Sequence, residues 1–223
     1  MSLLEIRDLE VNYEKPDGSL LKILAIREFL LEPAAQVCIK GHSGSGKTTL
    51  LNVISGIRTP SKGSVKLDGA DLSQLSEAGR DLARGRNIGF VFQTFNLLAG
   101  FTALENVILG SVFAGDQNEE DSVTQKRALD LLEKVGLRER VHHRPRMMSS
   151  GEQQRVAIAR ALINKPKLIL ADEPTGALDE VNSRDVLELI LSLASASGAG
   201  LLLVTHDPAV MGRFSKVIDL KNI

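Results

Sequence analysis

A phosphate-binding loop is predicted by eight consecutive residues, which are Gly41, His42, Ser43, Gly44, Ser45, Gly46, Lys47 and Thr48. They follow the apolar run VCI, open a helix-like segment and fit the pattern G-x-x-x-x-G-K-[ST], in which His42 stands at a free position. The glycines permit a tight turn whose backbone N–H groups face phosphate oxygens, while Lys47 brings positive charge and Thr48 offers an oxygen to Mg²⁺. A plain Gly/Ser linker would leave the flanking strand and helix unexplained.

Two adjacent acids, Asp172 and Glu173, close the apolar run LILADE. A carboxylate at the carboxyl end of a strand, near a phosphate loop, can hold Mg²⁺ through water. A second acid beside it can orient or deprotonate an attacking water. Acids after a strand are often only turn residues, but the phosphate loop earlier in the chain favours the catalytic interpretation.

Two further polar residues end apolar runs: His206 follows LLLVT, and Gln93 follows IGFVF. If these strand ends face the same crevice, the imidazole can contact a γ-phosphate and the amide oxygen can reach Mg²⁺ or the attacking water. The alternatives are a structural histidine and an ordinary polar residue at a strand end. The residues alone leave both interpretations open.

The elements that must position these side chains alternate between strand and helix. The runs QVCIK, IGFVF, LILAD and LLLVT lack alternation, which is typical of strands buried on both faces of a sheet. Between them lie KTTLLNVISG, which ends near Gly56, and VNSRDVLELILSLASASG, which ends at Gly198. This order predicts an α/β fold with a mainly parallel sheet. The stretches LLEIRDLEVNY and GSVKLDG alternate more and predict antiparallel strands at one edge.

An inserted helical lobe is predicted over residues 94–159, within an α/β core made of residues 1–93 and 160–223. The lobe has helical patterns in VTQKRALDLLEKVGL and EQQRVAIARAL and no strand-like run. Its polar stretch GDQNEEDS, residues 115–122, is predicted to be a solvated loop. The core and the lobe together form one domain.

A second helix start suited to phosphate lies in the segment RPRMMSSGEQQRVAIARAL. Ser149, Ser150, Gly151 and Glu152 have the S-x-x-E pattern of a capping box. The positive end of a helix attracts anions, phosphate among them. One chain would therefore hold two places for phosphate. An ordinary capped helix explains the S-x-x-E pattern but not its glycine-containing start beside an otherwise complete hydrolytic site.

Composition restricts the classes of function. Hydrophobic residues make up 43% of the 223 residues, enough for a sizeable core. The 27 basic and 28 acidic residues nearly cancel, so no nucleic-acid partner is expected. Cys38 is the single cysteine and is predicted to be a core residue, which suits a reducing, cytoplasmic setting. No apolar run approaches the length of a membrane-spanning helix, so any role at a membrane is expected to depend on a partner.

The order of these motifs closely resembles the nucleotide-binding subunits of ABC transporters, over nearly the whole chain. The resemblance identifies residues 41–48, followed by Thr49, as the Walker A loop and Gln93 as the Q-loop. It matches Asp172 to the Walker B acid, Glu173 to the catalytic glutamate and His206 to the switch histidine. It assigns three residues to the D-loop: Ala177, Leu178 and Asp179. Tyr13 falls at the position of the adenine-stacking aromatic, its alternative being an aromatic packed on an edge strand.

The activity that the resemblance implies is hydrolysis of ATP with Mg²⁺. Glu173 would act as the base, and Lys47, His206 and the metal would counter the charge that develops on the phosphoryl group. The ligands expected for the metal are Thr48, Gln93 and Asp172.

The resemblance also accounts for the second phosphate-binding helix start. In this family two subunits pack head to tail, and the signature helix of one points at the γ-phosphate bound by the other. The family pattern L-S-G-G-[QE] is occupied here by Met148, Ser149, Ser150, Gly151 and Glu152. Ser150 in place of glycine adds a Cβ near the nucleotide and would be strained if that position required a positive φ.

A homodimer at the cytoplasmic face of the inner membrane, driving a separate membrane subunit, is the assembly implied by the resemblance. The segment FVFQTFNLLAGFTALENV is similar to the lipoprotein-release and macrolide-export branch. In it, four large apolar residues precede a T-x-x-E capping box and are expected to dock the membrane subunit: Phe95, Leu97, Leu98 and Phe101. The alternative is that they close the core of the helical lobe.

Two other functions share part of the pattern. ABC-type ATPases of DNA repair or chromosome maintenance carry long coiled coils or zinc insertions, whereas this chain has no sustained heptads and one cysteine. A phosphate-loop kinase would leave the signature segment unexplained. The cargo is not encoded here, because the membrane subunit handles it.

Overall fold

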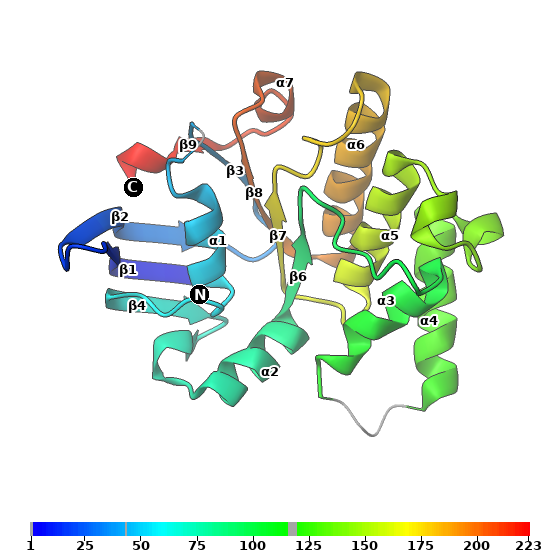
Figure 1. The fold of residues 1–223 in the computed structure, drawn as a ribbon, viewed down its shortest axis with the longest axis horizontal. Coiled ribbons are helices and arrows are strands. Elements are labelled where there is room, and N and C mark those ends of the chain that lie inside the picture. Colours follow the sequence, from blue (N-terminus) through cyan, green and yellow to red (C-terminus); the bar gives the residue numbers. More distant parts are fainter. Residues whose placement is uncertain (1, 43, 116–119) are drawn as a thin grey trace.

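The computed structural model describes residues 2–42, 44–115 and 120–223, and its strands form two sheets (Figure 1). An antiparallel sheet has the order β2-β1-β4-β5, and a parallel sheet has the order β6-β7-β8-β3-β9. The antiparallel strands are β1 (Leu4–Glu14), β2 (Leu20–Leu31), β4 (Lys62–Leu67) and β5 (Ala70–Asp71). The parallel strands are β3 (Gln36–Lys40), β6 (Ile88–Val91), β7 (Leu168–Asp172), β8 (Gly200–Thr205) and β9 (Val217–Asp219).

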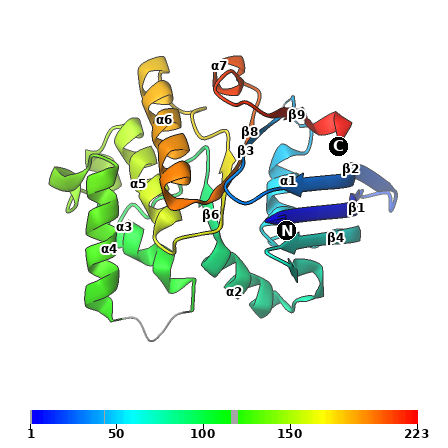
Figure 2. The same cartoon turned by 180° about the vertical axis from the view of Figure 1, so that it is seen from behind.

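Helices cover both faces of the parallel sheet. The α-helices are α1 (Lys47–Ile54), α2 (Glu77–Asn87), α3 (Ala103–Val112), α4 (Asp121–Lys134), α5 (Ser150–Leu162), α6 (Glu180–Ser197) and α7 (Pro208–Met211). Short 3-10 turns occupy Leu72–Gln74, Arg138–Arg140, Pro145–Met147 and Leu220–Asn222. Figures 1 and 2 show α1 on one side of the parallel sheet and α3 to α6 on the other. None of the described helices is long and apolar enough to cross a membrane.

The four predicted parallel strands are confirmed, and their unbroken hydrophobicity has a structural cause. Alternate side chains of β8 enter different cores: Leu201 and Leu203 pack with the helices α3 to α6, whereas Leu202 and Val204 pack toward α1 and the antiparallel sheet. Both faces of the strand are therefore buried, which removes the polar alternation of a one-sided strand. Cys38 of β3 lies in the first core, as predicted, and burial raises the pKa of its thiol to about 12.

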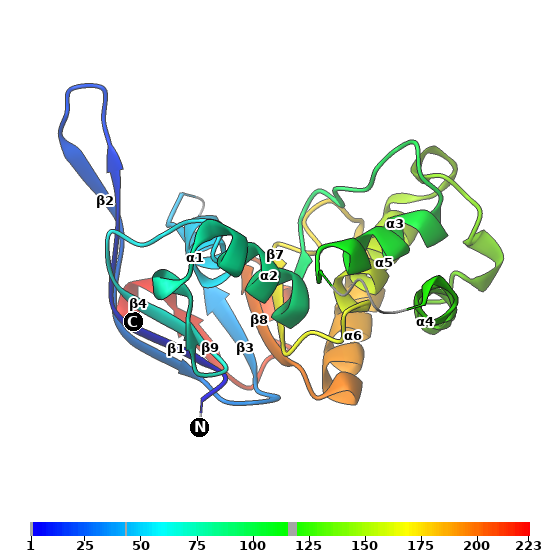
Figure 3. The same cartoon turned by 90° about the horizontal axis from the view of Figure 1, so that it is seen from below.

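The antiparallel pairing of the two alternating stretches is confirmed, but their predicted place is wrong. They do not extend the parallel sheet at an edge; with β2, which the sequence pattern did not reveal, they form a sheet of their own among the described residues. The two sheets face each other across a core that includes Ile6, Leu51 and Val204. Figure 3 shows the β1–β2 hairpin extending beyond the rest of that sheet.

The predicted helix ends are confirmed where glycine terminates them. Gly56 after α1 and Gly198 after α6 have φ values of 71° and 70°, the left-handed conformation that closes a helix at little cost for glycine. The polar stretch at 115–122 is shorter as a loop than predicted, because α4 already begins at Asp121, whose acid favours the positive end of a helix. Residues 116–119 of that stretch lie outside the described residues.

Helices α3, α4 and α5 pack against one another at the end of the molecule opposite the antiparallel sheet (Figure 3). The predicted lobe ends at residue 159, but α5 continues as one helix to Leu162. The first hydrophobic core is likewise shared, since Val156 of α5 and Ile169 of β7 belong to the same cluster. A continuous helix and a common core bind these helices to the parallel sheet.

Candidate active site

The carboxyl ends of three parallel strands meet the loop after β3 and the β1–β2 hairpin at a pocket of about 660 Å³. Its lining residues are Tyr13, Leu21, Ile23, Gly44, Gly46, Lys47, Thr48, Thr49, Gln93, Asp172, Glu173 and His206. Polar side chains that are far apart in the sequence thus share one crevice. This is the position at which open parallel sheets bind ligands.

The loop after β3 has the backbone conformation of a phosphate loop. Gly44 and Gly46 have φ values of 75° and 95°, and a Cβ on Gly46 would lie 2.7 Å from Leu24 Cδ2. Gly41 is also closely packed, since a Cβ there would lie 2.4 Å from Ser45 Oγ. That hydroxyl is buried without a hydrogen-bond partner among the described residues, so the loop retains an unused donor. The predicted Ser43 lies outside the described residues.

Lys47 is buried at the start of α1, with an exposed fraction of 6%. Its Nζ donates to the carbonyl oxygens of Gly41 at 2.7 Å and His42 at 3.0 Å. Glu173 Oε1 lies 3.5 Å away and supplies an opposite charge. The loop therefore holds the ammonium group inside the pocket, where an anionic ligand can meet it.

Glu173 lies directly after β7 with a φ of 44°, a conformation that is uncommon for a residue with a side chain. Its Oε1 lies 2.7 Å from His206 Nδ1, and its Oε2 accepts a hydrogen bond from Thr205 Oγ1 at 2.7 Å. The ends of β7 and β8 are thereby joined through one carboxylate. Sequence reasoning missed Thr205; the signal available was its position between a buried strand and His206.

The two neighbouring acids have opposite pKa shifts. Burial raises the pKa of the Asp172 carboxyl, and the hydrogen bond from Thr48 only partly opposes it. Burial also acts to raise the pKa of Glu173, but the hydrogen bonds from His206 and Thr205 and the charge of Lys47 outweigh it and hold that pKa below its ordinary value. The environment of Glu173 therefore favours its charged form, whereas that of Asp172 disfavours it.

Gln93 and the segment after Glu173 are in contact. A Cβ on Gly176 would lie 2.9 Å from Gln93 Nε2, so this glycine lets the amide approach the backbone. A buried residue that sequence reasoning missed, Gln154 of α5, donates to the carbonyl oxygens of Phe92 at 3.2 Å and Pro174 at 2.5 Å. It joins α5 to the ends of β6 and β7. Its only signal was a polar residue at the fifth position of α5, on the same helix face as Ala157 and Ile158.

The segment 149–152 has the predicted geometry but lies elsewhere. Ser149 Oγ accepts from the Glu152 N–H at 3.2 Å, and Glu152 Oε2 accepts from the Ser149 N–H at 2.8 Å, which confirms the capping box. Among the described residues that line the pocket, none comes from this segment. The second helix start and the phosphate loop of one chain are therefore not parts of one crevice.

Ser150 does not have the positive φ that would have strained its backbone. Ser150 is the first residue of α5 and is absent from the described residues with positive φ, so its Cβ is compatible with the backbone. Gly151 is the constrained position, because a Cβ there would lie 2.5 Å from Asn182 Oδ1. Asn182 in turn is held by Asp179, whose two carboxylate oxygens accept from its N–H at 2.9 Å and its Nδ2 at 2.6 Å. One asparagine thus connects the D-loop residues with the start of α5.

The other predicted D-loop residues flank this contact. Ala177 is exposed, and Leu178 is partly buried against the core beneath the helices. Asp179 caps α6. The segment from Glu173 to Asp179 therefore begins at the pocket and ends beside the start of α5. It connects the two places in the chain that are predicted to bind phosphate.

The four apolar residues at 95–101 divide into two groups. Leu97 is packed against the core beneath the helices, whereas Leu98 and Phe101 are exposed by 45% and 41%. The buried Asn106 holds the loop by accepting from the Leu98 N–H at 2.8 Å and donating to the carbonyl oxygen of Phe101 at 3.2 Å. Arg160 donates to the carbonyl oxygen of Phe95 at 2.9 Å. Leu97 therefore fits the alternative interpretation, in which the apolar residue packs into the core beneath the helices.

A parallel sheet, a glycine-rich loop that buries a lysine and a glutamate at the end of β7 define the chain as a phosphate-loop nucleotide-binding protein. The family model described as "ABC transporter" matches residues 26–176. The chain belongs to the ABC transporter ATP-binding family.

Relatives of known name support this assignment. The lipoprotein-releasing system ATP-binding protein LolD of Pseudomonas fluorescens is 44% identical over 220 residues, which covers 99% of this chain and 95% of the relative. The macrolide export ATP-binding/permease protein MacB of Hyphomonas neptunium is 41% identical, covering 99% of this chain and 33% of the relative. These matches make the chain an ATP-hydrolysing subunit of transporter type and set aside the DNA-repair alternative.

A solved structure has the same fold. The dimeric ATP-binding cassette MJ0796, in a post-hydrolysis state bound to ADP and Pi, superimposes with a TM-score of 0.87 at 35% identity, covering 97% of this chain and 93% of that chain. A second dimeric structure of MJ0796 gives a TM-score of 0.87 at 36% identity. The α/β architecture predicted from the sequence is thus confirmed.

Proposed function

We propose that the chain hydrolyses Mg²⁺-ATP as one half of a head-to-tail homodimer and drives a separate membrane subunit of the lipoprotein-release type. The observation that carries the proposal is the separation of the capped helix start at Ser149 from the pocket that contains Lys47 and Glu173. A phosphate bound in the pocket leaves this helix start without a ligand in its own chain. A second chain supplies one, and the dimeric structures of the related cassette support such an assembly.

The chemistry is transfer of the γ-phosphoryl group to water. Glu173 accepts the proton of the attacking water, and its lowered pKa keeps it in the basic form. Lys47 and His206 stabilise the charge on the phosphate oxygens, and the glycine-rich loop supplies backbone N–H groups. Tyr13 stacks on adenine with its exposed ring. We expect His42, Ser43, Ser45 and Thr49 to contact the nucleotide as well.

The donor set at the pocket fits Mg²⁺. Thr48 donates a hydrogen bond to Asp172, and Gln93 lines the same pocket, so hydroxyl, amide and carboxylate oxygens are within one crevice. Mg²⁺ prefers such oxygen ligands and shares its coordination with substrate phosphates. Thr48, Gln93 and Asp172 would hold the ion, which when bound neutralises charge on the phosphates.

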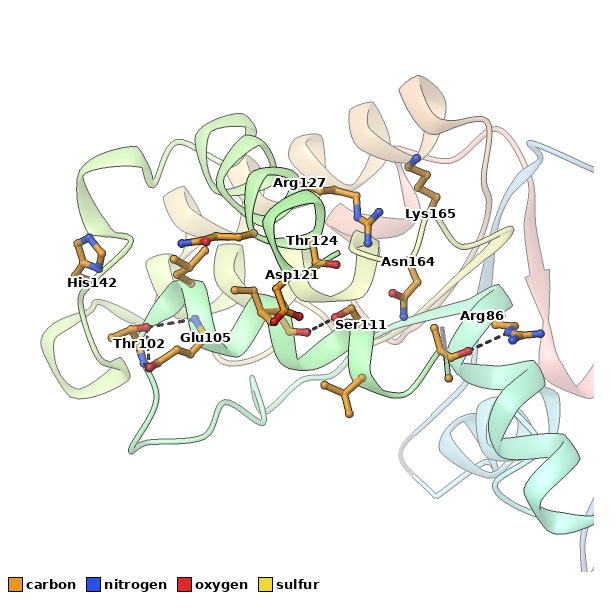
Figure 4. A pocket seen from close by; sticks show the side chains of 16 residues that line it. Arg86, Thr102, Glu105, Ser111, Asp121, Thr124, Arg127, His142, Asn164 and Lys165 are labelled. Atoms are coloured by element: carbon orange, nitrogen blue, oxygen red, sulfur yellow. Dashed lines mark hydrogen bonds between the residues drawn. The ribbon is translucent and has the colours of Figure 1, made fainter. Parts of the chain in front are cut away.

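The membrane subunit docks beside the loop that follows Gln93. A hollow of about 960 Å³ includes Thr102, the residue that ends this loop and caps α3, and Figure 4 shows other side chains of the hollow coming from α2 (Arg86), α3 (Ser111) and α4 (Asp121, Thr124). Leu98 and Phe101 offer exposed apolar surface just before α3, whereas Phe95 is half-buried and Leu97 packs against the core beneath the helices. A partner helix seated there would reach Gln93 through the loop. Residues 94–159 then act as the lobe that receives the membrane subunit, on a core of residues 1–93 and 160–223.

The lipoprotein-release type is favoured over macrolide export by coverage. The chain spans nearly the whole of the LolD relative but a third of the MacB relative, whose name includes a permease. The site of action is the cytoplasmic face of the inner membrane, where the protein is held peripherally by its membrane subunit. The near-zero net charge gives no support to a nucleic-acid partner.

Stimulated ATP hydrolysis tests the proposal. The chain would be purified with its membrane subunit, placed in lipid vesicles and supplied with a lipid-modified lipoprotein, with the same protein lacking its lipids, or with a macrolide. We expect the lipid-modified protein alone to raise ATP turnover. Stimulation by the macrolide instead would indicate that the chain is of the macrolide-export type. Equal rates of ATP hydrolysis with the lipid-modified protein, the lipid-free protein and the macrolide would contradict both cargo classes.

A further inference from the structure

Arg58 joins the helix that follows the phosphate loop to the strand that carries Tyr13. Its guanidinium carbon lies 3.7 Å from the centre of the Tyr13 ring. Its Nη2 donates to the carbonyl oxygen of Asn12 at 3.0 Å, and its backbone N–H donates to the carbonyl oxygen of Asn52 in α1 at 3.0 Å. Because α1 begins at Lys47, the ring of Tyr13 is tied to the element that positions the phosphate site.

The backbone before Tyr13 is held by the same short segment. The β1–β2 register shifts between Val11 and Asn12, and such a shift re-aims the side chains that follow it. The N–H of Asn12 donates to Ser61 Oγ at 3.0 Å, so both backbone groups of this residue are bonded to the segment 58–61. Ser61 is itself fixed, since its N–H donates to the carbonyl oxygen of Glu10 at 2.8 Å.

Arg58 contacts the Tyr13 ring but is not part of the pocket that Tyr13 lines. Among the described residues that line the pocket, Tyr13 is included and Arg58 is not; Arg58 instead borders a separate small hollow with Gly56 and Arg80. The ring is still 42% exposed. One face is therefore covered by a cation, and the ring remains accessible from the pocket.

We infer that Arg58 is a positioning residue for the base of the nucleotide: it fixes the Tyr13 ring so that its other face receives a purine. The inference rests on the proposed function, because it requires ATP to occupy the pocket with its adenine against Tyr13. Arg58 touches neither the phosphates nor the attacking water, and its effect on ATP passes through the tyrosine.

Two physical effects support this role. A free tyrosine must lose rotamer freedom when the base binds, which lowers affinity by roughly two- to tenfold for one side chain, whereas a ring ordered beforehand avoids the loss. A cation over one face also draws π-electron density toward itself and favours an electron-rich purine on the other face. Hydrogen bonding alone does not explain the position of the Arg58 guanidinium, because its Nε is buried without a hydrogen-bond partner among the described residues.

The composition of the chain supplies the probe. Tyr13 is the single tyrosine and there is no tryptophan, so tyrosine emission of the whole protein reports on this ring. The wild type and Arg58→Ala would be titrated with ATP and, separately, with inorganic tripolyphosphate, which engages the phosphate loop without a base. Arg80→Ala, which removes an equal charge from the same small hollow without touching Tyr13, is the matched control.

We expect ATP to change the tyrosine emission of the wild type and of Arg80→Ala. In Arg58→Ala the Kd for ATP and the KM of hydrolysis should rise roughly three- to tenfold while kcat is retained, since the base is ordered less well. The Kd for tripolyphosphate should stay unchanged, and Arg58→Lys, which keeps the cation, should restore part of the ATP affinity. If Arg58→Ala does not fold, the neutral Arg58→Gln takes its place.

Three results would overturn the inference and can be told apart from failure of the proposed function. An unchanged Kd for ATP in a folded Arg58→Ala, or an equal loss for ATP and tripolyphosphate, means that Arg58 does not act through the base. If ATP binds the wild type without changing its tyrosine emission, the stacking on Tyr13 itself is wrong, and the role of Arg58 falls with it. Phosphate binding and hydrolysis would still stand in that case.

Discussion

His206 Nδ1 lies 2.7 Å from Glu173 Oε1, and this contact joins the ends of two neighbouring parallel strands. The exposed fractions of the two side chains differ widely, 68% for His206 and 12% for Glu173. A solvent-exposed imidazole thus bonds to a largely buried carboxylate. The histidine lines the pocket and is accessible to a bound phosphate, whereas the glutamate is held in place by Thr205.

Glu173→Gln should separate ATP binding from hydrolysis. The amide keeps the shape of the side chain but cannot accept a proton, so turnover should fall by about 10²- to 10⁴-fold. We expect ATP-bound dimers to persist, visible as a doubled mass in light scattering. Glu188→Gln, which alters a surface carboxylate paired with Arg213, is the control and should hydrolyse normally. A normal rate in Glu173→Gln would remove Glu173 from the reaction.

His206→Ala should change how stability depends on pH. The pKa of Glu173 is held below its ordinary value in the fold, with burial opposing the shift and the His206 hydrogen bond the largest contribution favouring it. A lowered carboxyl pKa stabilises the fold above the pKa of the unfolded chain, and this stability is lost as pH falls through the folded pKa. The Tm difference between the wild type and the variant should therefore be large near neutral pH and shrink on acidification. His142→Ala should show a weaker trend, because that imidazole makes only the smallest contribution to the lowered pKa of Glu105.

Ser149→Arg and Lys47→Ala should complement each other in a mixture. Each change damages a different part of the composite site, so a mixed dimer has one undamaged site and one site with both defects. With random pairing we expect roughly a quarter of the wild-type turnover from the mixture, and little from either chain alone. Ser149→Ala, which removes only the helix cap, controls for its loss of about 1 kcal/mol. Full activity in pure Ser149→Arg would contradict the shared site.

Ser150→Gly and Gly151→Ala should have different effects on stability and on ATP turnover. Ser150 is helical, so glycine there costs at most about 1 kcal/mol of stability and should leave turnover unchanged or higher. Gly151→Ala forces Asn182 to move and disturbs its bonds to Asp179. We expect a lower Tm and slower ATP turnover in Gly151→Ala. A large loss in Ser150→Gly would show that its hydroxyl has a positive role.

Leu98→Glu should weaken association with the membrane subunit, because it places a charge on exposed apolar surface, while the isolated chain keeps its fold and its ATPase activity. Leu97→Glu, at the adjacent partly buried position, should instead lower the Tm, since a charge would enter the core beneath the helices. Co-purification in detergent and thermal unfolding measure the two effects. Normal co-purification of a folded Leu98→Glu would exclude Leu98 as an essential contact.

The sequence by itself determined the local elements and the strand ends of the site. Buried parallel strands read as unbroken apolar runs, and the glycines at 44, 46, 56 and 198 stand where positive φ values occur. Both capping boxes follow from patterns four residues long. Because the carboxyl ends of parallel strands meet at one edge, the sequence was enough to predict that Lys47, Asp172 and His206 share a crevice.

Tertiary structure alone decided the contacts between segments that are distant along the chain. No periodicity reveals that the antiparallel strands form a separate sheet, because pairing depends on which apolar faces meet across a core. Packing also determined that Leu97 is partly buried while its neighbour Leu98 is exposed. It placed the guanidinium of Arg58 over the ring of Tyr13, although the two residues are 45 positions apart in the sequence. These contacts depend on the directions of side chains in three dimensions, and residue types and spacing carry no record of those directions.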